Sequence, residues 1–575
     1  MRASVRWRER PGDEVQAARL SATGLSPILA RLLAARGLTS GSLESFFDPA
    51  LARLASPADL PGIRAAVDVI LPFVADHRKI VVFGDYDADG VCASAILVRT
   101  IRRLGGVADA FIPERMTEGY GMTEASLARL FAEQPDMALV ITVDNGITAP
   151  REVEAIKARG IAVVVTDHHL PGSEMPAPDA LVNPRVASAS GCEGLCGAGV
   201  AFFLAAALAK EAAARGVYDG GKFAGPLLVL AGLATVADLM PLMDQNRILV
   251  TQALAAFRAC APVGLRELYD RAARRAAPLG SRDFGFMLAP RINAAGRMDT
   301  ARVAYDLLMT EDREEARQLA VRVDNFNVSR KAEEQRMEQA VREQCGSLEG
   351  VSAVVARGED WHSGVAGIVA ARVMETAHVP VAVAVGDHGS VRAPDGYNVH
   401  DALTAASAAL VRFGGHAAAG GFTVQPGRYD EFKRLFTEAC AAQHAAAPDA
   451  AAILFDGWLE PHELSLDLCR DLERLEPFGE GNPEPVFGLQ NVAFSDIRPM
   501  GIDGRHVSFT FANKSIPRAV WWNHGCDAEE LRAHAAARFD LLFTLQTSDY
   551  GPDGPVPELR LVDVRPCQPS KLNDR

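Results

Sequence analysis

Acidic residues crowd the end of one apolar run in this sequence. The run KIVVFG leads directly into DYDADG, whose acids are Asp85, Asp87 and Asp89. Carboxylates at this spacing can converge on one point, where they repel one another unless a cation lies between them. The same residues could instead cap a helix or form a turn, since Asp and Gly favour both positions. An EF-hand is disfavoured because its twelfth position, counted from Asp85, is Ile96 rather than glutamate.

Further acids and two adjacent histidines follow later apolar runs. ALVITV leads into Asp144, and IAVVVT leads into Asp167, His168 and His169. Because the carboxyl ends of parallel strands share one edge of a sheet, we expect these groups to meet. One histidine could be a metal ligand and the other a substrate contact, with Asp167 orienting an imidazole. Asp238 interrupts the apolar segment LATVADLMP, where it is either a helix cap or a buried carboxylate that needs a partner or a metal.

The donor types in these motifs favour particular metals. Oxygen-rich sites with one or two imidazoles suit Mn²⁺ or Mg²⁺, whereas structural zinc sites use more thiolates. The only close cysteine pair, Cys192 and Cys196, has no second pair nearby. Two metal ions a few ångströms apart suit phosphoryl hydrolysis, because they activate a water and neutralise charge on the phosphate. We therefore predict a phosphoesterase with two Mn²⁺ or Mg²⁺ ions.

Candidate phosphate contacts lie in turn-like or glycine-rich settings. They are Arg115 in PERMTEGYG, Arg291 and Arg297 in APRINAAGRM, Arg392 in GSVRAP, and His416 in FGGHAAAGG. Glycine lets backbone N–H groups approach an oxyanion, and arginine supplies a bidentate fork. Taken singly, each arginine is explained at least as well by a surface salt bridge. No Walker loop or dinucleotide fingerprint occurs, so neither NTP-driven work nor NAD chemistry is indicated.

The elements that must position these residues form two α/β patterns and a β-rich end. Between residues 79 and 184, apolar runs alternate with amphipathic helices, which predicts a doubly wound parallel sheet buried on both faces. A helical stretch then ends in a charged segment without Pro or Gly, which predicts one long connecting helix near residue 345. A second α/β pattern starts at Val351, and short strands from about Pro477 fit a small β-barrel.

Composition narrows the function classes further. Of 575 residues, 49% are hydrophobic and 23% charged, which excludes a mostly disordered chain. The net charge of -14 argues weakly against non-specific nucleic-acid binding. Residues 261–302, however, contain eight arginines and four acids, so this segment is either a basic stripe or a solvated helix face. We predict no membrane span, because the apolar stretches are too short to cross a bilayer. The charged N-terminus and the nine scattered cysteines predict a cytoplasmic protein with reduced thiols.

The ordered motifs resemble a known family. DYDADG, VDNG, DHH and VADLMP are similar to the DHH phosphoesterases, and APRINAAGRM, HSGVAGIVAAR, FGGHAAAGG and LEPFGEGNPEPVF are similar to the RecJ single-stranded-DNA-specific exonucleases. The resemblance covers about residues 79–564 and implies Mn²⁺- or Mg²⁺-dependent removal of mononucleotides from a 5′ end, in DNA repair and recombination. It implies five segments: an N-terminal extension at 1–60, a DHH catalytic domain at 61–300, a connecting long helix at 301–345, a DHHA1 domain at 346–450 and an OB-fold domain at 451–575.

The resemblance also assigns roles to residues. By motif position, the implied metal ligands are Asp87, Asp89, Asp144, His168 and Asp238, to which we add Asp85. In the wider superfamily a histidine stands four residues before the position of Asp87, where this chain has Phe83, so which acid completes the first metal site stays open. We assign catalytic roles to His169, His416 and Arg291. We assign substrate contacts to Arg115, Asn293, Arg297, Arg392, Gly414, Gly415 and Trp521.

Two other functions stay open at this stage. One is a DHH phosphodiesterase acting on short oligonucleotides or cyclic dinucleotides, against which the extra OB-like region argues. The other is a non-catalytic DNA-binding scaffold, against which the intact acids and histidines argue. In the barrel, Phe509, Trp521 and Trp522 either stack on bases or pack in the core. The expected partners are single-stranded DNA, a single-strand-binding protein and a helicase, and the expected state is a monomer.

Overall fold

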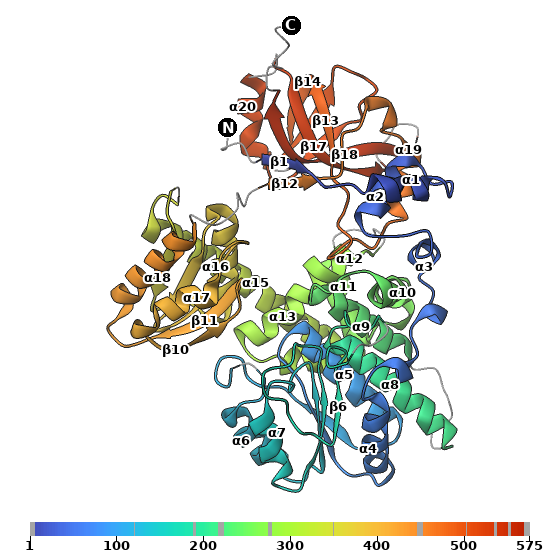
Figure 1. Ribbon diagram of the computed structural model, residues 1–575, viewed down its shortest axis with the longest axis vertical. Helices are drawn as coiled ribbons and strands as arrows, with labels where there is room; N and C mark the ends of the chain where they lie inside the picture. Colours follow the sequence, from blue (N-terminus) through green and yellow to red (C-terminus); the bar gives the residue numbers. More distant parts are fainter. Residues whose placement is uncertain are drawn as a thin grey trace. The chain divides into compact units, whose positions relative to one another are not determined.

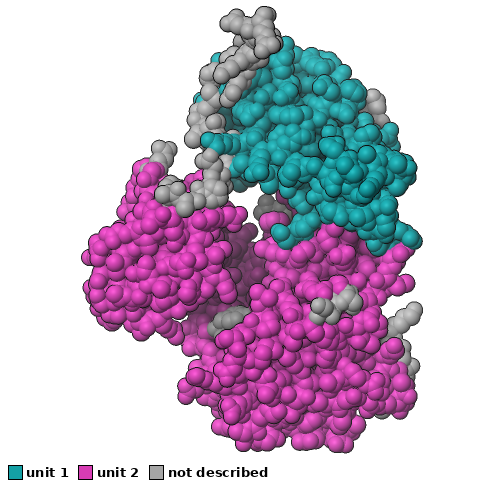
Figure 2. All heavy atoms as spheres, viewed as in Figure 1, with its two compact units in different colours: residues 1–48, 451–575 teal, residues 49–450 magenta. Residues whose placement is uncertain are grey.

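The two ends of the chain pack together. The computed structural model describes residues 6–119, 121–187, 191–216, 224–273, 279–348, 350–444, 452–501, 503–533, 537–549 and 554–567. Unit 1 comprises residues 1–48 and 451–575, and unit 2 comprises residues 49–450 (Figure 2). In unit 1, strand β1 (Arg6–Glu9) pairs in parallel with β12 (Ala452–Phe455). The N-terminal residues, predicted to be an extension, thus form part of unit 1; their pairing was not predicted, because a four-residue strand carries too short a pattern to indicate its partner.

A five-stranded parallel sheet lies at the centre of the first lobe of unit 2, as predicted. Its order is β3-β2-β4-β5-β6, with bounds Ala108–Phe111, Ile80–Phe83, Leu139–Val143, Ala162–Thr166 and Ala180–Val182. Helices α6 (Glu124–Glu133) and α7 (Pro150–Lys157) cover one face, and α5 (Ala88–Arg103) covers the other (Figure 1). Since the chain runs from β2 outward to β3 and then returns to β4, the strand order reverses between β2 and β4. Ligand sites of doubly wound sheets lie at such a reversal.

Among the described residues, helix α8 (Gly197–Ala214) is long and apolar enough to span a membrane. The same holds for α10 (Asp244–Cys260) and α11 (Val263–Ala272) if this bent pair is taken as one span. In the fold, α8 packs against α5, against α4 (Ile63–Ala75) and against α9 (Ala224–Ala237). These helices share one apolar core in unit 2, and 56% of the apolar window of α8 is buried there. The apolar composition of α8 therefore serves the core that supports the sheet.

One long helix connects the two lobes of unit 2, as predicted. This helix, α15 (Arg313–Cys345), follows α13 (Ala289–Met298) and α14 (Arg302–Met309), both of which pack against it. Asp312 caps its first turn by accepting a hydrogen bond from the backbone N–H of Glu315. Short turns of helix precede α13, namely α12 (Ser281–Asp283) and the π-helical η3 (Phe284–Leu288).

The second lobe of unit 2 is a smaller α/β fold. Its sheet has the order β10-β11-β9-β8-β7, with bounds Leu410–Gly415, Ala419–Val424, His388–Arg392, Val381–Val385 and Val354–Gly358. Only the pair β7 and β8 is parallel in this sheet. The helices of the lobe are α16 (Ser363–Ala377), α17 (Val399–Ala405) and α18 (Tyr429–His444) (Figure 1).

Unit 1 is built around a mainly antiparallel six-stranded sheet, consistent with the predicted OB fold. Its order is β13-β17-β18-β16-β15-β14, with bounds Phe487–Val492, Phe539–Ser548, Val556–Pro566, Ala519–Trp521, His506–Phe511 and Phe494–Met500. The helices of this unit are α1 (Glu14–Ser21), α2 (Pro27–Ala35), α3 (Leu43–Phe47), α19 (Leu466–Glu473) and α20 (Ala528–Ala533). Trp7 of β1 donates from Nε1 to Asp563 at 2.7 Å, so the N-terminal strand is tied to the sheet.

A buried ionic network joins α15 to the second lobe. Glu334 of α15 is fully buried and pairs with Arg330 one turn earlier. Its other oxygen lies 3.1 Å from Nη2 of Arg372, which belongs to α16. Arg330 also donates from Nη2 to Asn327 at 2.9 Å. A buried carboxylate shared by two guanidinium groups fixes the contact between the two helices, because removing one member leaves the others uncompensated.

We expect Glu334→Gln to lower the free energy of unfolding of unit 2 by about 3 kcal/mol, because it leaves the buried guanidinium of Arg330 without its counter-charge. Calorimetric melting of the full chain measures the shift. The matched control is Glu343→Gln, since Glu343 lies exposed on the same helix and bonds only to Gln339 among the contacts recorded for the described residues. Equal melting temperatures for the two variants would contradict the structural role of the network.

Candidate metal centre

The acids after β2 lie at the start of helix α5. Asp87 is the N-cap residue, and its Oδ1 accepts hydrogen bonds from the backbone N–H groups of Asp89 and Gly90, both at 3.0 Å. Asp85 is buried, and its Oδ1 accepts from the N–H of Tyr86 at 2.7 Å. The capping interpretation and the metal interpretation are thus compatible, because each capping carboxylate keeps a second oxygen for another ligand.

Asp89 is held by the first residues of helix α8. Its two oxygens accept from the backbone N–H groups of Gly197 and Ala198, at 2.6 and 2.7 Å. These N–H groups have no partner inside the helix, and the positive end of the helix dipole favours a carboxylate there. Sequence reasoning missed this support, although the Gly-Ala-Gly run at residues 197–199 is a signal for it. A Cβ at Gly197 would lie 2.5 Å from the Cβ of Asp144, so only glycine permits the approach.

The ends of β4 and β5 bring further ligands to the same point. Asp144 follows β4 with a left-handed φ of 62°, and His168 follows β5. Nε2 of His168 lies 3.1 Å from Oδ1 of Asp144, 3.6 Å from Oδ2 of Asp238 and 3.8 Å from Oδ2 of Asp89. The predicted convergence of strand ends is therefore observed, at the reversal between β2 and β4.

His169 and Asp167 form a hydrogen-bonded pair beside this cluster. Nδ1 of His169 lies 2.8 Å from Oδ1 of Asp167, which also accepts from the backbone N–H groups of His168 and His169. Oδ2 of Asp167 accepts from the N–H of Ile147 at 2.9 Å. Asp167 thus orients an imidazole, as predicted, and both of its oxygens accept hydrogen bonds.

Burial and mutual repulsion set the protonation of these groups. Burial, and then the neighbouring carboxylates, raise the pKa of Asp85, Asp87 and Asp144. Burial and the charges of Asp89 and Asp87 raise the pKa of Asp238 to about 8. In the absence of a cation, the cluster therefore resists becoming fully ionised near neutral pH.

The two histidines are shifted in opposite directions. Burial lowers the pKa of His168, which favours the neutral ring that binds a metal. Burial also opposes the charged form of His169, but the hydrogen bond with Asp167 outweighs it, so the pKa of His169 is raised. One imidazole is thus suited to be a ligand and the other to carry a proton.

Several donor atoms of the cluster are buried without a hydrogen-bond partner. They are Oδ1 of Asp144, Oδ2 of Asp238, and Nδ1 and Nε2 of His168. Three groups of residues can each offer ligand atoms within 4.8 Å of one another, namely Asp85–Asp87–Asp144, Asp89–His168–Asp238 and Asp144–His168–His169. Unpaired buried carboxylates and imidazoles are costly, and divalent cations satisfy them. The donor set of oxygens with one or two imidazoles fits Mn²⁺ or Mg²⁺.

Three of the predicted phosphate contacts lie beside this cluster or near one another. The guanidinium of Arg115 lies over the ring of Tyr86, 4.9 Å from its centroid, and Tyr86 follows Asp85. Arg297 donates from Nη1 to the carbonyl of Gly364, at the start of α16, and burial followed by Arg115 lowers its pKa to about 10. Burial and the charge of Arg115 also lower the pKa of Arg392. These three arginines form a cationic group that repels itself, which favours an anion among them.

Two of the residues predicted to contact substrate form hydrogen bonds to neighbouring helices. Arg291 donates from Nε to Asp324 of α15 at 2.9 Å and from Nη1 to the carbonyl of Met287. Oδ1 of Asn293 accepts from the backbone N–H of Ala88 at 2.7 Å, which ties α13 to the start of α5. Within the basic stretch, Arg274 and Arg275 lie outside the described residues. Since Arg291 and Asn293 support neighbouring elements, their assignment as catalytic and substrate residues stays a prediction.

The remaining predicted contacts lie in the second lobe and in unit 1. His416 is exposed in the turn between β10 and β11, after Gly414 and Gly415, and Gly415 has a φ of 138°. Trp521 was predicted to stack on bases, but only 8% of it is exposed and its ring stacks on His524 with centroids 3.8 Å apart. This assignment is corrected, because the ring packs inside unit 1. Its neighbour Trp522 is 43% exposed.

A doubly wound sheet with acids and histidines at its reversal, joined by a long helix to a smaller α/β lobe, defines the two-domain DHH phosphoesterase class. Family models agree: the DHH family N-terminal domain matches residues 79–223, the DHHA1 domain matches 350–442, and the RecJ OB domain matches 455–555.

Similar proteins of known sequence and structure show to which family within this class the chain belongs. The single-stranded-DNA-specific exonuclease RecJ of Dickeya dadantii is 37% identical over 85% of this chain and 87% of its own, and that of Escherichia coli is 35% identical over the same shares. A crystal structure of RecJ from Thermus thermophilus in complex with Mn²⁺ superposes with a TM-score of 0.83 and 31% identity, covering 99% of this chain and 81% of that one. The same protein has been solved with Mg²⁺. The chain therefore belongs to the RecJ family.

The raised pKa values predict how pH affects the metal-free protein. A carboxyl whose pKa is higher in the folded state than its unfolded value of about 4 loses its contribution to stability as pH rises through the folded pKa. With Asp238 at about 8, the melting temperature of the EDTA-treated chain should fall by several degrees between pH 6 and 8.5. Mn²⁺ should abolish most of that fall, because it compensates the ionised cluster.

A matched pair of variants checks this origin. Asp144→Asn removes one buried charge, so it should raise the melting temperature in EDTA at pH 8 and reduce the stabilisation by Mn²⁺. Asp270→Asn is the control, because Asp270 is exposed and pairs with Arg258 on the surface. An identical pH dependence in Asp144→Asn and in the unaltered chain would argue against the cluster as its source.

Proposed function

We propose that this protein is a metal-dependent exonuclease that degrades single-stranded DNA from the 5′ end to mononucleotides, in DNA repair and recombination. The observation that carries the proposal is the cluster of orphaned carboxylate and imidazole atoms at the sheet reversal. The names of the relatives supply the substrate, since those that match most of this chain are single-stranded-DNA-specific exonucleases. The 5′ polarity rests on the family resemblance.

The metal ligands in this proposal are Asp85, Asp87, Asp89, Asp144, His168 and Asp238. When bound, two Mn²⁺ or Mg²⁺ ions supply an activated water and neutralise charge on the phosphate. The chain positions these ligands in advance, because Asp87 and Asp89 are each fixed by two backbone N–H groups. Fixed ligands need no reorganisation during the reaction, which is the basis of electrostatic preorganisation.

His169 and the arginines act on the phosphate in this proposal. Oδ1 of Asp167 accepts a hydrogen bond from Nδ1–H of His169, so the ring is held in one orientation and its pKa is raised. A protonated imidazole beside the metal cluster stabilises negative charge on the phosphate. Arg115, Arg297 and Arg392 hold non-bridging oxygens, and His416 with Gly414 and Gly415 approaches the strand from the second lobe.

The wider setting of the activity is also a proposal. We expect the protein to work as a cytoplasmic monomer alongside a single-strand-binding protein and a helicase, which supply and protect single strands. The domain boundaries at residues 60, 300, 345 and 450 stay part of this proposal. The RecJ OB match favours a long strand over short oligonucleotides or cyclic dinucleotides as the substrate.

We expect Asp89→Asn to lower kcat on single-stranded DNA by at least about 100-fold, which is roughly 2.7 kcal/mol of barrier. The variant keeps one oxygen but loses the charge that the metal site requires. The assay follows 5′-labelled and 3′-labelled strands, with duplex and dinucleotide controls, in Mn²⁺, Mg²⁺ or EDTA. Asp270→Asn serves as the surface control, and metal-independent cleavage by the unaltered chain would refute the proposal.

Unit 1 should contribute affinity rather than chemistry. All proposed ligands lie in unit 2, and a solved RecJ exonuclease bound to manganese corresponds to only 66% of this chain. A chain of residues 49–450 should cleave at saturating DNA but bind long strands at least about tenfold more weakly, since each stacked base adds about 1 to 3 kcal/mol. Removing residues 1–48 together with 451–575 avoids leaving β1 without its partner. Fluorescence anisotropy measures the affinity, and unchanged binding would contradict this division.

A further inference from the structure

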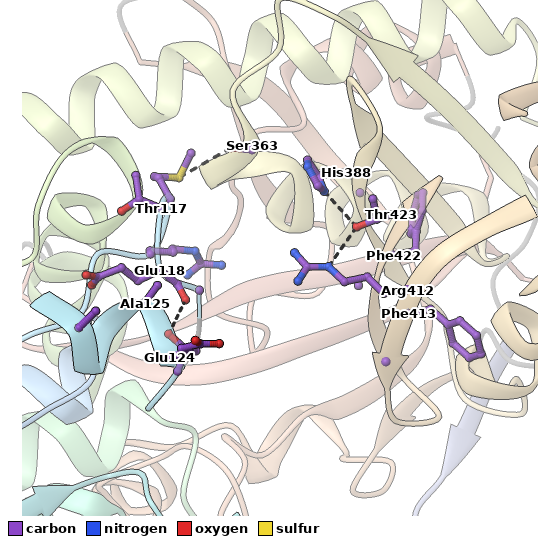
Figure 3. Close-up of a pocket in the computed structure, with 18 residues that line it drawn as sticks. Thr117, Glu118, Glu124, Ala125, Ser363, His388, Arg412, Phe413, Phe422 and Thr423 are labelled. Atoms are coloured by element: carbon purple, nitrogen blue, oxygen red, sulfur yellow. Dashed lines mark hydrogen bonds between the residues drawn. The ribbon is translucent and has the colours of Figure 1, made fainter. Parts of the chain in front are cut away.

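Unit 2 holds a pocket of about 1040 Å³ that is lined by residues of both of its lobes. One wall is the sheet of the second lobe, through β9, β10 and β11, and the other is the segment from Arg115 to the start of α6 (Figure 3). Arg115 also lies over Tyr86, which follows the metal-centre acid Asp85. Arg115 therefore links the pocket to the surroundings of the proposed catalytic site. On the sheet wall, Gly414 is a predicted substrate contact, and Arg412, Thr423 and His388 line the same wall.

Strand alternation identifies which side chains face this pocket. In β11, Phe422 and Val424 are buried in the core of the second lobe, so Gly421 and Thr423 face the other way. The register pairs Thr423 with His388 of β9 and with Arg412 of β10. Three neighbouring strands thus present His388, Thr423 and Arg412 as one row on the pocket wall, as Figure 3 shows.

Hydrogen bonds fix the side chains of this row. Oγ1 of Thr423 lies 3.0 Å from Nδ1 of His388 and accepts from Nε of Arg412 at 3.4 Å. Arg412 pairs with no carboxylate among the described residues, so its Nη atoms have no recorded ion pair. Across the pocket, Glu118 is already paired with Arg129 at 2.6 Å, and Glu124 is exposed. The sheet wall consequently presents Arg412 with no acid beside it among the residues that line the pocket, whereas the opposite wall holds Arg115 together with Glu118 and Glu124.

The floor between these side chains is bare backbone. Gly414 and Gly421 lie side by side in the register, and both line the pocket. A Cβ on Gly414 would meet nothing within 4 Å, and one on Gly421 would meet only the carbonyl of Gly389 at 3.8 Å. Packing of the lobe therefore does not require either glycine, whereas a ligand lying flat on the sheet would.

We propose that His388, Thr423 and Arg412 form a further phosphate subsite for the nucleic-acid strand, away from the scissile phosphate. The proposal rests on the proposed nuclease function. His388 and Arg392 lie on the same face of β9, two repeats or about 13 Å apart along the strand. A single nucleotide cannot span that distance between the subsite and Arg392, but a strand of about three can.

The test compares long and short substrates in the full-length, metal-loaded protein. Arg412→Ala should raise KM for a 20-nucleotide single strand at least about fivefold with little change in kcat, and should leave KM for a dinucleotide unaffected. The slope of log KM against log salt should become shallower by about 0.7, as expected for one lost phosphate contact to a single strand. Arg412→Lys should restore part of the affinity. Arg434→Ala is the control, since Arg434 is exposed on α18 and pairs with Glu438.

A second variant tests the same surface by shape. A Cβ at Gly421 meets only the carbonyl of Gly389 at 3.8 Å, so Gly421→Leu should leave the melting temperature unchanged. The leucine side chain covers the bare backbone of the pocket wall, so KM for the long strand should rise as it does in Arg412→Ala. Unchanged KM and salt slope in both variants would overturn the subsite while the unaltered chain still cleaves. The subsite would also be overturned if the variants raised KM for the dinucleotide as much as KM for the long strand. The same holds if their only change were weaker inhibition by free deoxynucleoside monophosphate. Failure of the nuclease function itself would appear as no metal-dependent cleavage by the unaltered chain.

Discussion

Repulsion among buried carboxylates is the constraint on which this structure depends. Asp85, Asp89 and Asp144 are buried and converge with the half-buried Asp87 at one edge of the sheet, where little water remains to screen them. The N-terminus of α8 compensates part of that charge through two N–H groups on Asp89. The remaining oxygens still require a cation, so the arrangement that destabilises the metal-free fold is also what makes the site select a divalent metal. Stability and chemistry are therefore linked through the same few atoms.

The second lobe matters because this centre has no means of recognising a strand. Carboxylates and a metal act on one phosphate, and they are indifferent to what lies on either side of it. Two contacts tie α16 of the second lobe to α13 and to the connecting helix α15: Arg297 donates to the carbonyl of Gly364, and the buried carboxylate of Glu334 pairs with Arg372. Because both bonds lie inside unit 2 and one of them involves a buried carboxylate, they hold the second lobe against the helices that carry it.

Much of the fold and of the metal centre could be predicted because their signals are local in sequence. Continuous apolar strands ending in acids indicate a parallel sheet with a shared ligand edge, and Asp144, His168 and Asp238 meet there. Burial was harder to foresee: Trp521 lies in a strand whose pattern does not reveal which face is covered, and its ring is enclosed against His524. The support of Asp89 by Gly197 and the pairing of β1 with β12 join segments more than 100 residues apart, so no local pattern shows which distant residue each segment contacts.

The three residues of the proposed subsite on the sheet wall were also not predictable from the sequence, because they lie apart along the chain. His388, Arg412 and Thr423 come from three strands, and nothing in their separate sequences distinguishes them from ordinary exposed residues. Only the register places them in one row, and only the burial of Phe422 determines which face that row occupies. Since the metal centre acts on a single phosphate, preference for a strand over a mononucleotide has to come from contacts spaced along the chain of phosphates. A strand of the sheet, with same-face residues every two positions, provides such a spacing by its geometry alone.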